Sequence, residues 1–297
     1  DIVIINGEGD VVFARPSRRQ ILFFAAVIRL ARQLGKRVAF VNAQLSDCPL
    51  TGRNPEAFDV IAGALQECHF VSVRDPESRL IAQREMGLGE AAMIPDALFS
   101  WFDAQRDART HLPSNGDFVI PPPEREELLG RLDFSRDYIC VAGNSLASRP
   151  GHQEALSEGY RRLLVAIRSL GLPVYLVIAD GPDRFLLELA RQLELPVVPL
   201  ETPIYFAAAI LGRARLLVSG RYHPVIMGAL GGTPSLLLST GSHKMRSLAR
   251  VLEHERLEVF PATPDAAAVR RLARAAAACL AAGSSLRARL QAVAEQR

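Results

Sequence analysis

Short apolar runs alternate with amphipathic segments through the first third of the chain. The apolar runs predict strands, and the longer segments with apolar residues at helical spacing predict helices. Strands are expected at 2–5, 37–41, 69–73 and 92–94, and helices at about 17–34, 55–66 and 76–87. This strand–helix alternation is typical of a parallel sheet covered by helices.

A second alternating set follows a stretch of different composition. Between Ser100 and Asp137 the chain is rich in linker-type residues, including the run Pro121-Pro122-Pro123. Strands are then expected at 138–142, 174–178, 197–198, 216–218 and 234–238, and helices at about 153–170, 183–193 and 205–213. An Ala-, Arg- and Leu-rich helical region follows Pro264.

The pattern therefore predicts an α/β protein with two Rossmann-like domains facing a cleft and a C-terminal helical region. We place the N-terminal domain at residues 1–120 and the C-terminal domain at 121–297. The first residue is Asp1, and a buried-type strand begins at once. We therefore expect residues upstream of Asp1 that complete the first domain.

Composition narrows the class of protein. The formal net charge of +3 is too small to indicate nucleic-acid binding. The longest apolar run, Ile21 to Ile28, is far shorter than the ~20 residues of a membrane span. The four cysteines form no CxxC pair, so we expect no zinc site, reduced thiols and a cytoplasmic location.

Basic residues cluster after two of the predicted strands. Arg221 and His223 follow the strand at 216–218, and Lys244 follows the strand at 234–238. Ligands of parallel α/β sheets bind outside the carboxyl ends of the strands, so we expect these three side chains to share one anion-binding crevice. His223 precedes Pro224, which predicts a helix start, and it suits general acid–base chemistry. An ion pair for Arg221 and a solvated Lys244 remain open alternatives.

Other strand ends add candidates. Asn144 and Ser145 end the strand at 138–142, and Ser242 lies in a small-residue loop that suits an anion. Arg74 follows the strand at 69–73 and is expected to point into the cleft, while Asp75 is expected to cap a helix.

The first predicted strand supplies a separate group of candidates. Asn6 and Glu8 lie in the loop that follows it, and Arg15 precedes the first helix. Glu8 has the chemistry to bind a sugar hydroxyl. We assign these three residues to a sugar-binding site, which would be the acceptor site if the protein transfers a group to a sugar.

The order of these motifs resembles the polysaccharide pyruvyl transferase family. The matching stretches are spread over most of the chain: 6–9, 73–78, 95–96, 143–145, 219–223, 232–234 and 242–244. The resemblance implies a fold like that of GT-B glycosyltransferases. It also implies transfer of pyruvate from phosphoenolpyruvate to two hydroxyls of a sugar, forming a ketal. His223 would be the acid–base residue, and Arg221, Lys244, Arg74, Asn144, Ser145 and Ser242 would bind the donor.

The implied reaction needs no metal and no cofactor beyond phosphoenolpyruvate as co-substrate. The acceptor would be a sugar, an oligosaccharide or a lipid-linked glycan of a bacterial exopolysaccharide or cell envelope. A lipid-linked acceptor would bring the protein to the inner face of the membrane as a peripheral protein. The chain departs from the family at its first strand, which the family usually precedes with another, and at Pro224.

Two alternatives remain at this point. The same fold could serve a GT-B glycosyltransferase that uses a nucleotide sugar, with its diphosphate at a helix N-terminus. The basic cluster could also belong to a non-catalytic subunit that binds a glycan or an anion. The sequence leaves the acceptor and the oligomeric state open.

Overall fold

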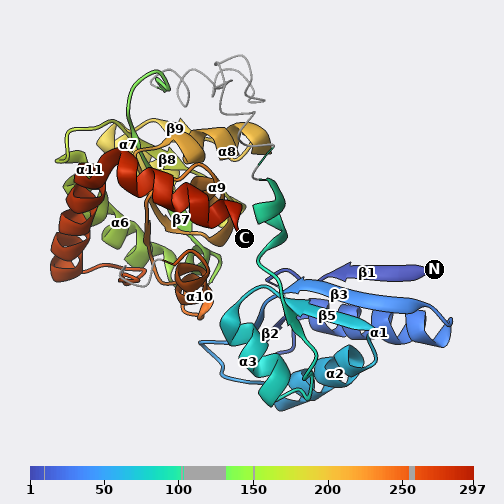
Figure 1. The fold of residues 1–297 in the computed structure, drawn as a ribbon. Helices are drawn as coiled ribbons and strands as arrows, with labels where there is room; N and C mark the ends of the chain where they lie inside the picture. The colour runs from blue at the N-terminus through green and yellow to red at the C-terminus, as the bar shows by residue number, and fades with distance from the viewer. Residues whose placement is uncertain (10, 102, 104–131, 150, 254–257) are drawn as a thin grey trace. The chain divides into compact units, whose positions relative to one another are not determined.

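The computed structural model describes residues 1–9, 11–101, 103, 132–149, 151–253 and 258–297 (Figure 1). The chain forms two compact units. The first unit contains residues 1–97 and 241–251, and the second contains residues 98–240 and 252–297. The expected boundary at residues 120 and 121, with most of the expected linker, lies outside the described residues.

A four-stranded parallel sheet with the order β1-β3-β5-β6 forms the centre of the first unit. Its strands are β1 (Ile2–Asn6), β3 (Arg37–Ala43), β5 (Phe70–Val73) and β6 (Ala92–Met93). The helices between them are α1 (Arg19–Gln33), α2 (Pro55–Gln66) and α3 (Pro76–Arg84). These elements confirm the predicted alternation, and α1 and α2 pack side by side against the sheet.

Two strands of the first unit were not predicted. β2 (Val11–Phe13) and β4 (Leu45–Asp47) pair in parallel as a separate small sheet. Val11, Phe13 and Leu45 are fully buried. A run of three residues is too short to carry a period that separates strand from loop, so tertiary packing decides these two strands.

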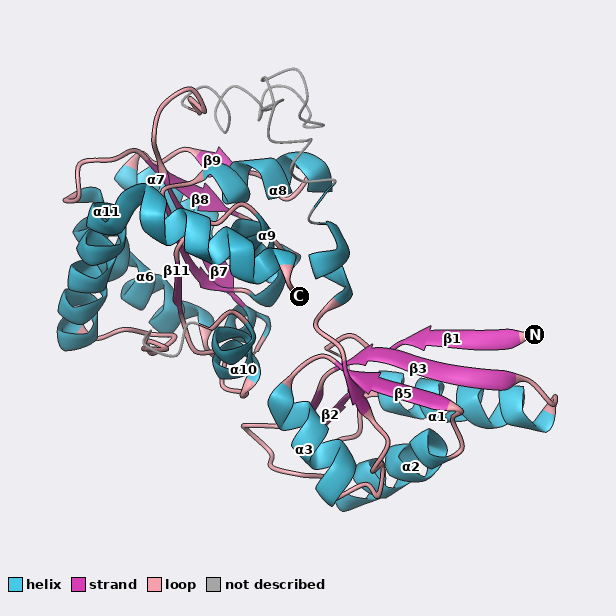
Figure 2. Ribbon diagram, in the orientation of Figure 1, coloured by secondary structure: helices cyan, strands magenta, loops and turns pink. Residues whose placement is uncertain are grey.

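The second unit has a five-stranded parallel sheet with the order β11-β10-β7-β8-β9. Its strands are β7 (Ile139–Asn144), β8 (Val174–Val177), β9 (Val197–Val198), β10 (Leu216–Gly220) and β11 (Ser235–Leu237). Figure 2 shows the paired strands β8 and β9 next to each other. The chain moves from β7 to β8 and β9 on one side and returns to β10 on the other. The boundary between β7 and β10 is therefore a topological switch point, where such sheets bind ligands.

The predicted helices of the second unit are all present. They are α6 (Gln153–Arg168), α7 (Phe185–Leu193), α8 (Ile204–Arg213), α9 (Tyr222–Leu230) and α11 (Ala266–Glu295), with 3₁₀ turns η3 (Ser145–Ser148) and η4 (Gly181–Arg184). The helix α11 is broken at Gly283, which has a φ of 56°. Cys140 and Cys279 are buried free thiols, as expected.

The helix α10 (Lys244–Val251) follows β11 in the chain, but it belongs to the first unit. No helix within the described ranges is both long and apolar enough to cross a membrane.

Candidate functional site

The carboxyl ends of β7, β8 and β10 meet around one arginine. Arg221 follows β10 as the N-cap residue of α9, with extended backbone angles of −112° and 133°. Its backbone N–H donates to the hydroxyl of Ser219 over 2.9 Å, and that hydroxyl donates to the Arg221 carbonyl over 3.0 Å. Ser219 therefore fixes the turn that aims the Arg221 side chain.

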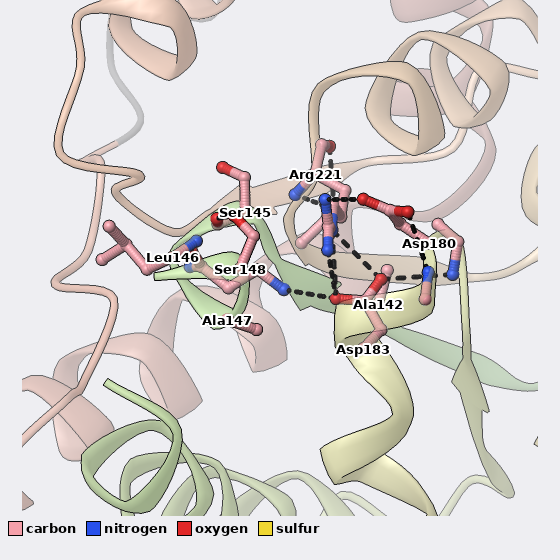
Figure 3. Close-up of polar contacts among 12 residues, drawn as sticks. Ala142, Ser145, Leu146, Ala147, Ser148, Asp180, Asp183 and Arg221 are labelled. Atoms are coloured by element: carbon pink, nitrogen blue, oxygen red, sulfur yellow. Dashed lines mark hydrogen bonds and ion pairs between the residues drawn. The ribbon is translucent and has the colours of Figure 1, made fainter. Parts of the chain in front are cut away.

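Two carboxylates hold the Arg221 guanidinium (Figure 3). Its Nε lies 3.0 Å from both carboxylate oxygens of Asp183, and its Nη2 donates to Asp183 Oδ1 over 2.8 Å. Its Nη1 donates to Asp180 Oδ2 over 2.9 Å. The ion-pair alternative that the sequence left open for Arg221 is therefore present in the structure.

Asp183 joins the ends of three neighbouring strands. It accepts the backbone N–H of Asn144 over 3.1 Å and of Ala179 over 3.2 Å, besides the guanidinium that follows β10. Its side chain is fully buried. Burial raises the pKa of the Asp183 carboxyl, and the charge and hydrogen bonds of Arg221 oppose that rise.

Two glycines make this close packing possible. A Cβ at Gly143 would lie 1.9 Å from Asp183 Oδ1, and a Cβ at Gly220 would lie 2.1 Å from Asn144 Nδ2. Both distances are far below van der Waals contact. The Gly-Asn and Gly-Arg pairs of the sequence therefore have a steric cause: each glycine leaves room for the polar group that crosses its strand end.

Both polar atoms of the Asn144 side chain form hydrogen bonds within the second unit. Its Oδ1 accepts the N–H of Leu146 over 2.9 Å and starts η3, and its Nδ2 donates to the carbonyl of Ser239 over 3.0 Å. Ser145 is the first residue of η3 and is half-buried, and its carbonyl accepts the hydroxyl of Ser148 over 2.7 Å. Of this predicted donor-binding pair, Asn144 orders the strand end and Ser145 lies nearer the surface.

His223 is the second residue of α9 and is half-buried. Its ring meets the buried ring of Tyr222 edge to face, with centroids 5.6 Å apart. The predicted helix start at this histidine is confirmed, and Pro224 occupies the third helical position. The structure thus places Arg221 and His223 together at the start of α9, at the switch point of the second sheet.

Arg74 differs from the expectation. It follows β5 as predicted, but its side chain is 2% exposed and donates to Asp96 Oδ2 over 2.6 Å. A second nitrogen donates to Gln44 Oε1 over 3.3 Å. Within the first unit the Arg74 guanidinium is therefore buried against an equally buried carboxylate, and its expected role in donor binding stays a prediction.

Asp75 caps α3, as predicted. Its Oδ1 accepts the N–H of Ser78 over 2.9 Å. It also lies 3.3 Å from Nε2 of His243 and accepts the Ser247 hydroxyl over 3.1 Å. Burial by itself raises the pKa of the Asp75 carboxyl, but His243 and Ser78 outweigh burial, and the pKa falls below its ordinary value.

Glu77, which lies in the first turn of α3 next to the Asp75 cap, also contacts α10. Glu77 accepts a hydrogen bond from the Ser247 hydroxyl and another from Arg250 Nη1, the latter over 2.6 Å. Lys244, the first residue of α10, and Ser242 just before it therefore belong to the first unit. The structure does not bring them into the unit that holds Arg221 and His223.

The predicted acceptor residues lie at strand ends of the first unit and are exposed. Asn6 Oδ1 accepts the N–H of Glu8 over 3.3 Å and the side-chain amide of Asn42 over 3.1 Å. Glu8 has a positive φ of 39°, and Arg15 follows β2 with its N–H donated to the Thr51 hydroxyl over 3.0 Å. Asn6 and Glu8 thus lie together, and Arg15 lies beyond the second strand.

Sequence reasoning missed Asp180 and Asp183. The signal was present, since Asp180-Gly181-Pro182-Asp183 directly follows the apolar run of β8. Two carboxylates after a predicted strand are natural partners for an arginine that follows another strand of the same sheet. Among the residues that the structure describes, no group of three or more His, Cys, Asp or Glu side chains could hold a metal ion.

Solved structures with a similar fold include two UDP-GlcNAc 2-epimerases and a UDP-forming synthase. The UDP-GlcNAc 2-epimerase of Neisseria meningitidis superposes with a TM-score of 0.60 at 10% identity, over 99% of this chain and 74% of that one. The epimerase of Methanocaldococcus jannaschii gives 0.58 at 12%, over 94% and 69%. A UDP-forming trehalose-phosphate synthase of Burkholderia xenovorans gives 0.57 at 13%, over 100% and 70%. The fold is therefore of the GT-B type.

The family follows from the sequence itself. The model of the polysaccharide pyruvyl transferase family matches residues 1–242, which include both motif-bearing strand ends of the second sheet. The chain belongs to that family and is on this ground a transferase. A search of curated proteins found no match to this chain.

Proposed function

We propose that this protein transfers pyruvate from phosphoenolpyruvate to two hydroxyls of a sugar and closes a cyclic ketal. The observation that carries the proposal is the Ser-Gly-Arg-Tyr-His segment at the switch point of the second sheet, in a chain of the pyruvyl transferase family. An imidazole two residues from a fixed guanidinium combines a proton carrier with a group that binds carboxylate or phosphate.

The reaction balances without a further reactant. A proton adds to the methylene carbon of phosphoenolpyruvate, and a sugar hydroxyl attacks the carbon that carries the phosphate ester. The C–O bond to phosphate breaks, and a second hydroxyl attacks the same carbon. Of the two hydroxyl protons, one balances the proton gained by the new methyl group and the other leaves with phosphate.

His223 would move one of these protons. General acid–base catalysis of this kind contributes roughly 10²- to 10⁴-fold to a rate. Arg221 would hold an anionic group of the donor, and the roles of Ser145, Ser242 and Lys244 in donor binding stay predictions. Asn144 and Arg74 would act through the strand ends that they order.

The acceptor is a glycan hydroxyl pair in this proposal. Asn6 and Glu8 offer exposed amide and carboxylate groups at strand ends of the first unit, and Arg15 offers an exposed cation. Such groups suit the hydroxyls of a sugar. A glycan of an exopolysaccharide or of the cell envelope, free or lipid-linked, would be the natural acceptor.

The test combines binding and turnover. Phosphoenolpyruvate binding is measured by calorimetry, with nucleotide sugars for comparison, and phosphate release is followed with a panel of sugar acceptors. The His223→Ala variant should keep its fold and bind phosphoenolpyruvate, but lose about 10²- to 10⁴-fold in phosphate release. His152→Ala is the matched control, because His152 is a half-buried histidine at the start of α6 in the same unit.

Two results would overturn the proposal. One is full turnover by the His223→Ala variant. The other is saturable binding of a nucleotide sugar with no binding of phosphoenolpyruvate, which would identify a glycosyltransferase.

A further inference from the structure

The two carboxylates that hold Arg221 lie in different surroundings. The Asp183 side chain is 0% exposed and accepts backbone N–H groups as well as the guanidinium. The Asp180 side chain is 55% exposed and meets the guanidinium at Nη1. Asp183 is therefore a buried partner that also contacts the backbone at the strand ends, whereas Asp180 contacts the same arginine from an exposed position.

These surroundings give the two contacts unequal strengths. An exposed ion pair contributes little, because water and salt screen it. A buried pair with additional hydrogen bonds is costly to break, because one charge would stay buried without its partner. An anion that approaches Arg221 would therefore displace Asp180 before it displaces Asp183.

Asp180 can leave without dismantling its own turn. Its Oδ1 accepts the N–H of Gly181 over 2.8 Å, and its carbonyl accepts the N–H of Asp183 over 2.9 Å. These contacts are local to η4 and do not include Arg221. When the Asp180 carboxylate turns away from Nη1, the backbone contact between Asp180 and Asp183 still holds the start of η4.

The charge balance makes this exchange necessary for anion binding. With both carboxylates ionised, the single positive charge of Arg221 is exceeded by two negative charges. A carboxylate or phosphate meets repulsion from Asp180 as long as Asp180 occupies Nη1. Removal of Asp180 from the guanidinium removes that repulsion and opens a planar donor edge that suits either anion.

We propose that Asp180 is an internal competitor for the anion subsite of Arg221, and that Asp183 is the positioning residue that keeps the guanidinium in place. In the bound state an anionic group of the substrate takes the position of the Asp180 carboxylate at Nη1. The identity of that substrate as phosphoenolpyruvate rests on the proposed function, whereas the exchange of one anion for another does not.

The test is the Asp180→Asn variant, with phosphoenolpyruvate and inorganic phosphate as separate calorimetric probes. Its affinity for the anion should rise by about two- to fivefold, the range expected when an exposed ion pair is lost. The Asp137→Asn variant is the matched control. Asp137 is 63% exposed, pairs with Arg215 over 3.7 Å and lies at the other end of the same sheet. Its affinity should match the wild type.

The Asp183→Asn variant should change the anion affinity in the opposite direction. It should weaken anion binding at least roughly tenfold, because a guanidinium without its buried partner no longer keeps one position. It should also lower the thermal midpoint, whereas Asp180→Asn should not. If the Asp183 variant does not fold, the comparison of Asp180→Asn with Asp137→Asn decides the matter alone.

The outcomes separate this inference from the proposed function. Tighter binding of phosphate by Asp180→Asn, with no phosphoenolpyruvate binding in any variant, supports the inference and refutes the proposed donor. An unchanged or weaker affinity in Asp180→Asn overturns the inference, even if phosphoenolpyruvate binds. Binding of neither anion to the wild type or to Asp180→Asn also overturns it.

Discussion

The two units each place an arginine directly after a strand of a parallel sheet, and the two arginines differ in how exposed their partners are. Arg74 pairs with Asp96, and both side chains are 2% exposed. Arg221 pairs with buried Asp183 and with Asp180, which is 55% exposed. A guanidinium is costly to separate from a buried partner, whereas an exposed second partner can be exchanged for a ligand.

The glycines beside the two arginine sites also differ in how tightly they are packed. A Cβ at Gly9 would lie 3.1 Å from the tip of Arg74, a tight contact that a side chain can relieve. A Cβ at Gly143 would lie 1.9 Å from Asp183 Oδ1, which leaves no room at all. The packing around Asp183 therefore tolerates an added side-chain atom less well than the packing around Arg74 does.

The largest expected effect comes from breaking the buried pair of the first unit. Asp96→Asn leaves the Arg74 charge buried without a counter-ion, which should cost about 3–5 kcal/mol. The measurement is amide hydrogen exchange of β5 and β6, which reports the free energy of opening in this unit. Lys36→Ala, which removes an exposed ion pair with Asp1 in the same unit, should cost no more than about 1 kcal/mol. Equal costs for the two variants would show that the Arg74–Asp96 pair does not stabilise the strand end.

A smaller effect is expected from adding one methyl group at the second strand end. Gly143→Ala should displace the Asp183 carboxylate and cost roughly 1–3 kcal/mol, the usual range for overpacking. It should also weaken anion binding at Arg221, because Asp183 holds that guanidinium. Gly181→Ala is the control, since a Cβ there meets no atom within 4 Å. Stability and anion affinity are measured for both variants, and matching results would contradict the steric account of Gly143.

The sequence predicted where the strands end better than it predicted which carboxylates pair with the arginines at those ends. Apolar runs and helix caps locate β5, β10, α3 and α9, because these signals are local. The partner of Arg74 lies 22 residues further along the chain, and Asp183 lies 38 residues before Arg221. Which carboxylate reaches which arginine depends on the strand order, and no local pattern contains that order.

The segment 241–251 shows the same limit. Its position after the strand at 234–238 was predicted, and its membership of the first unit was not. That membership depends on contacts with Asp75 and Glu77, which lie about 170 residues earlier in the chain. The Asp75-Pro76 pair was correctly interpreted as a helix start, but a helix cap gives no sign that it also holds a distant helix.

The smallest expected effect is a pH-dependent change in how strongly Asp75 stabilises α10. Asp75→Asn keeps the cap of α3, since asparagine caps as well as aspartate. It replaces charge-assisted contacts with His243 and Ser247 by neutral ones, which should cost about 1 kcal/mol at neutral pH. The pKa of the native Asp75 carboxyl is lowered, so its stabilising contribution is complete above the unfolded value of about 4. The contribution is lost as the pH falls below that value towards the folded pKa, because the unfolded chain takes up the proton first.

Hydrogen exchange of the α10 amides measures this contribution along the acid side. In the wild type, protection of α10 should fall as the pH drops below about 4, after correction for the intrinsic exchange rate. In Asp75→Asn the protection should start lower and change less over the same range. Asp59→Asn, at an exposed position of α2, controls for the loss of one negative charge. If Asp75→Asn and Asp59→Asn follow the same curve, the Asp75 carboxylate does not hold α10.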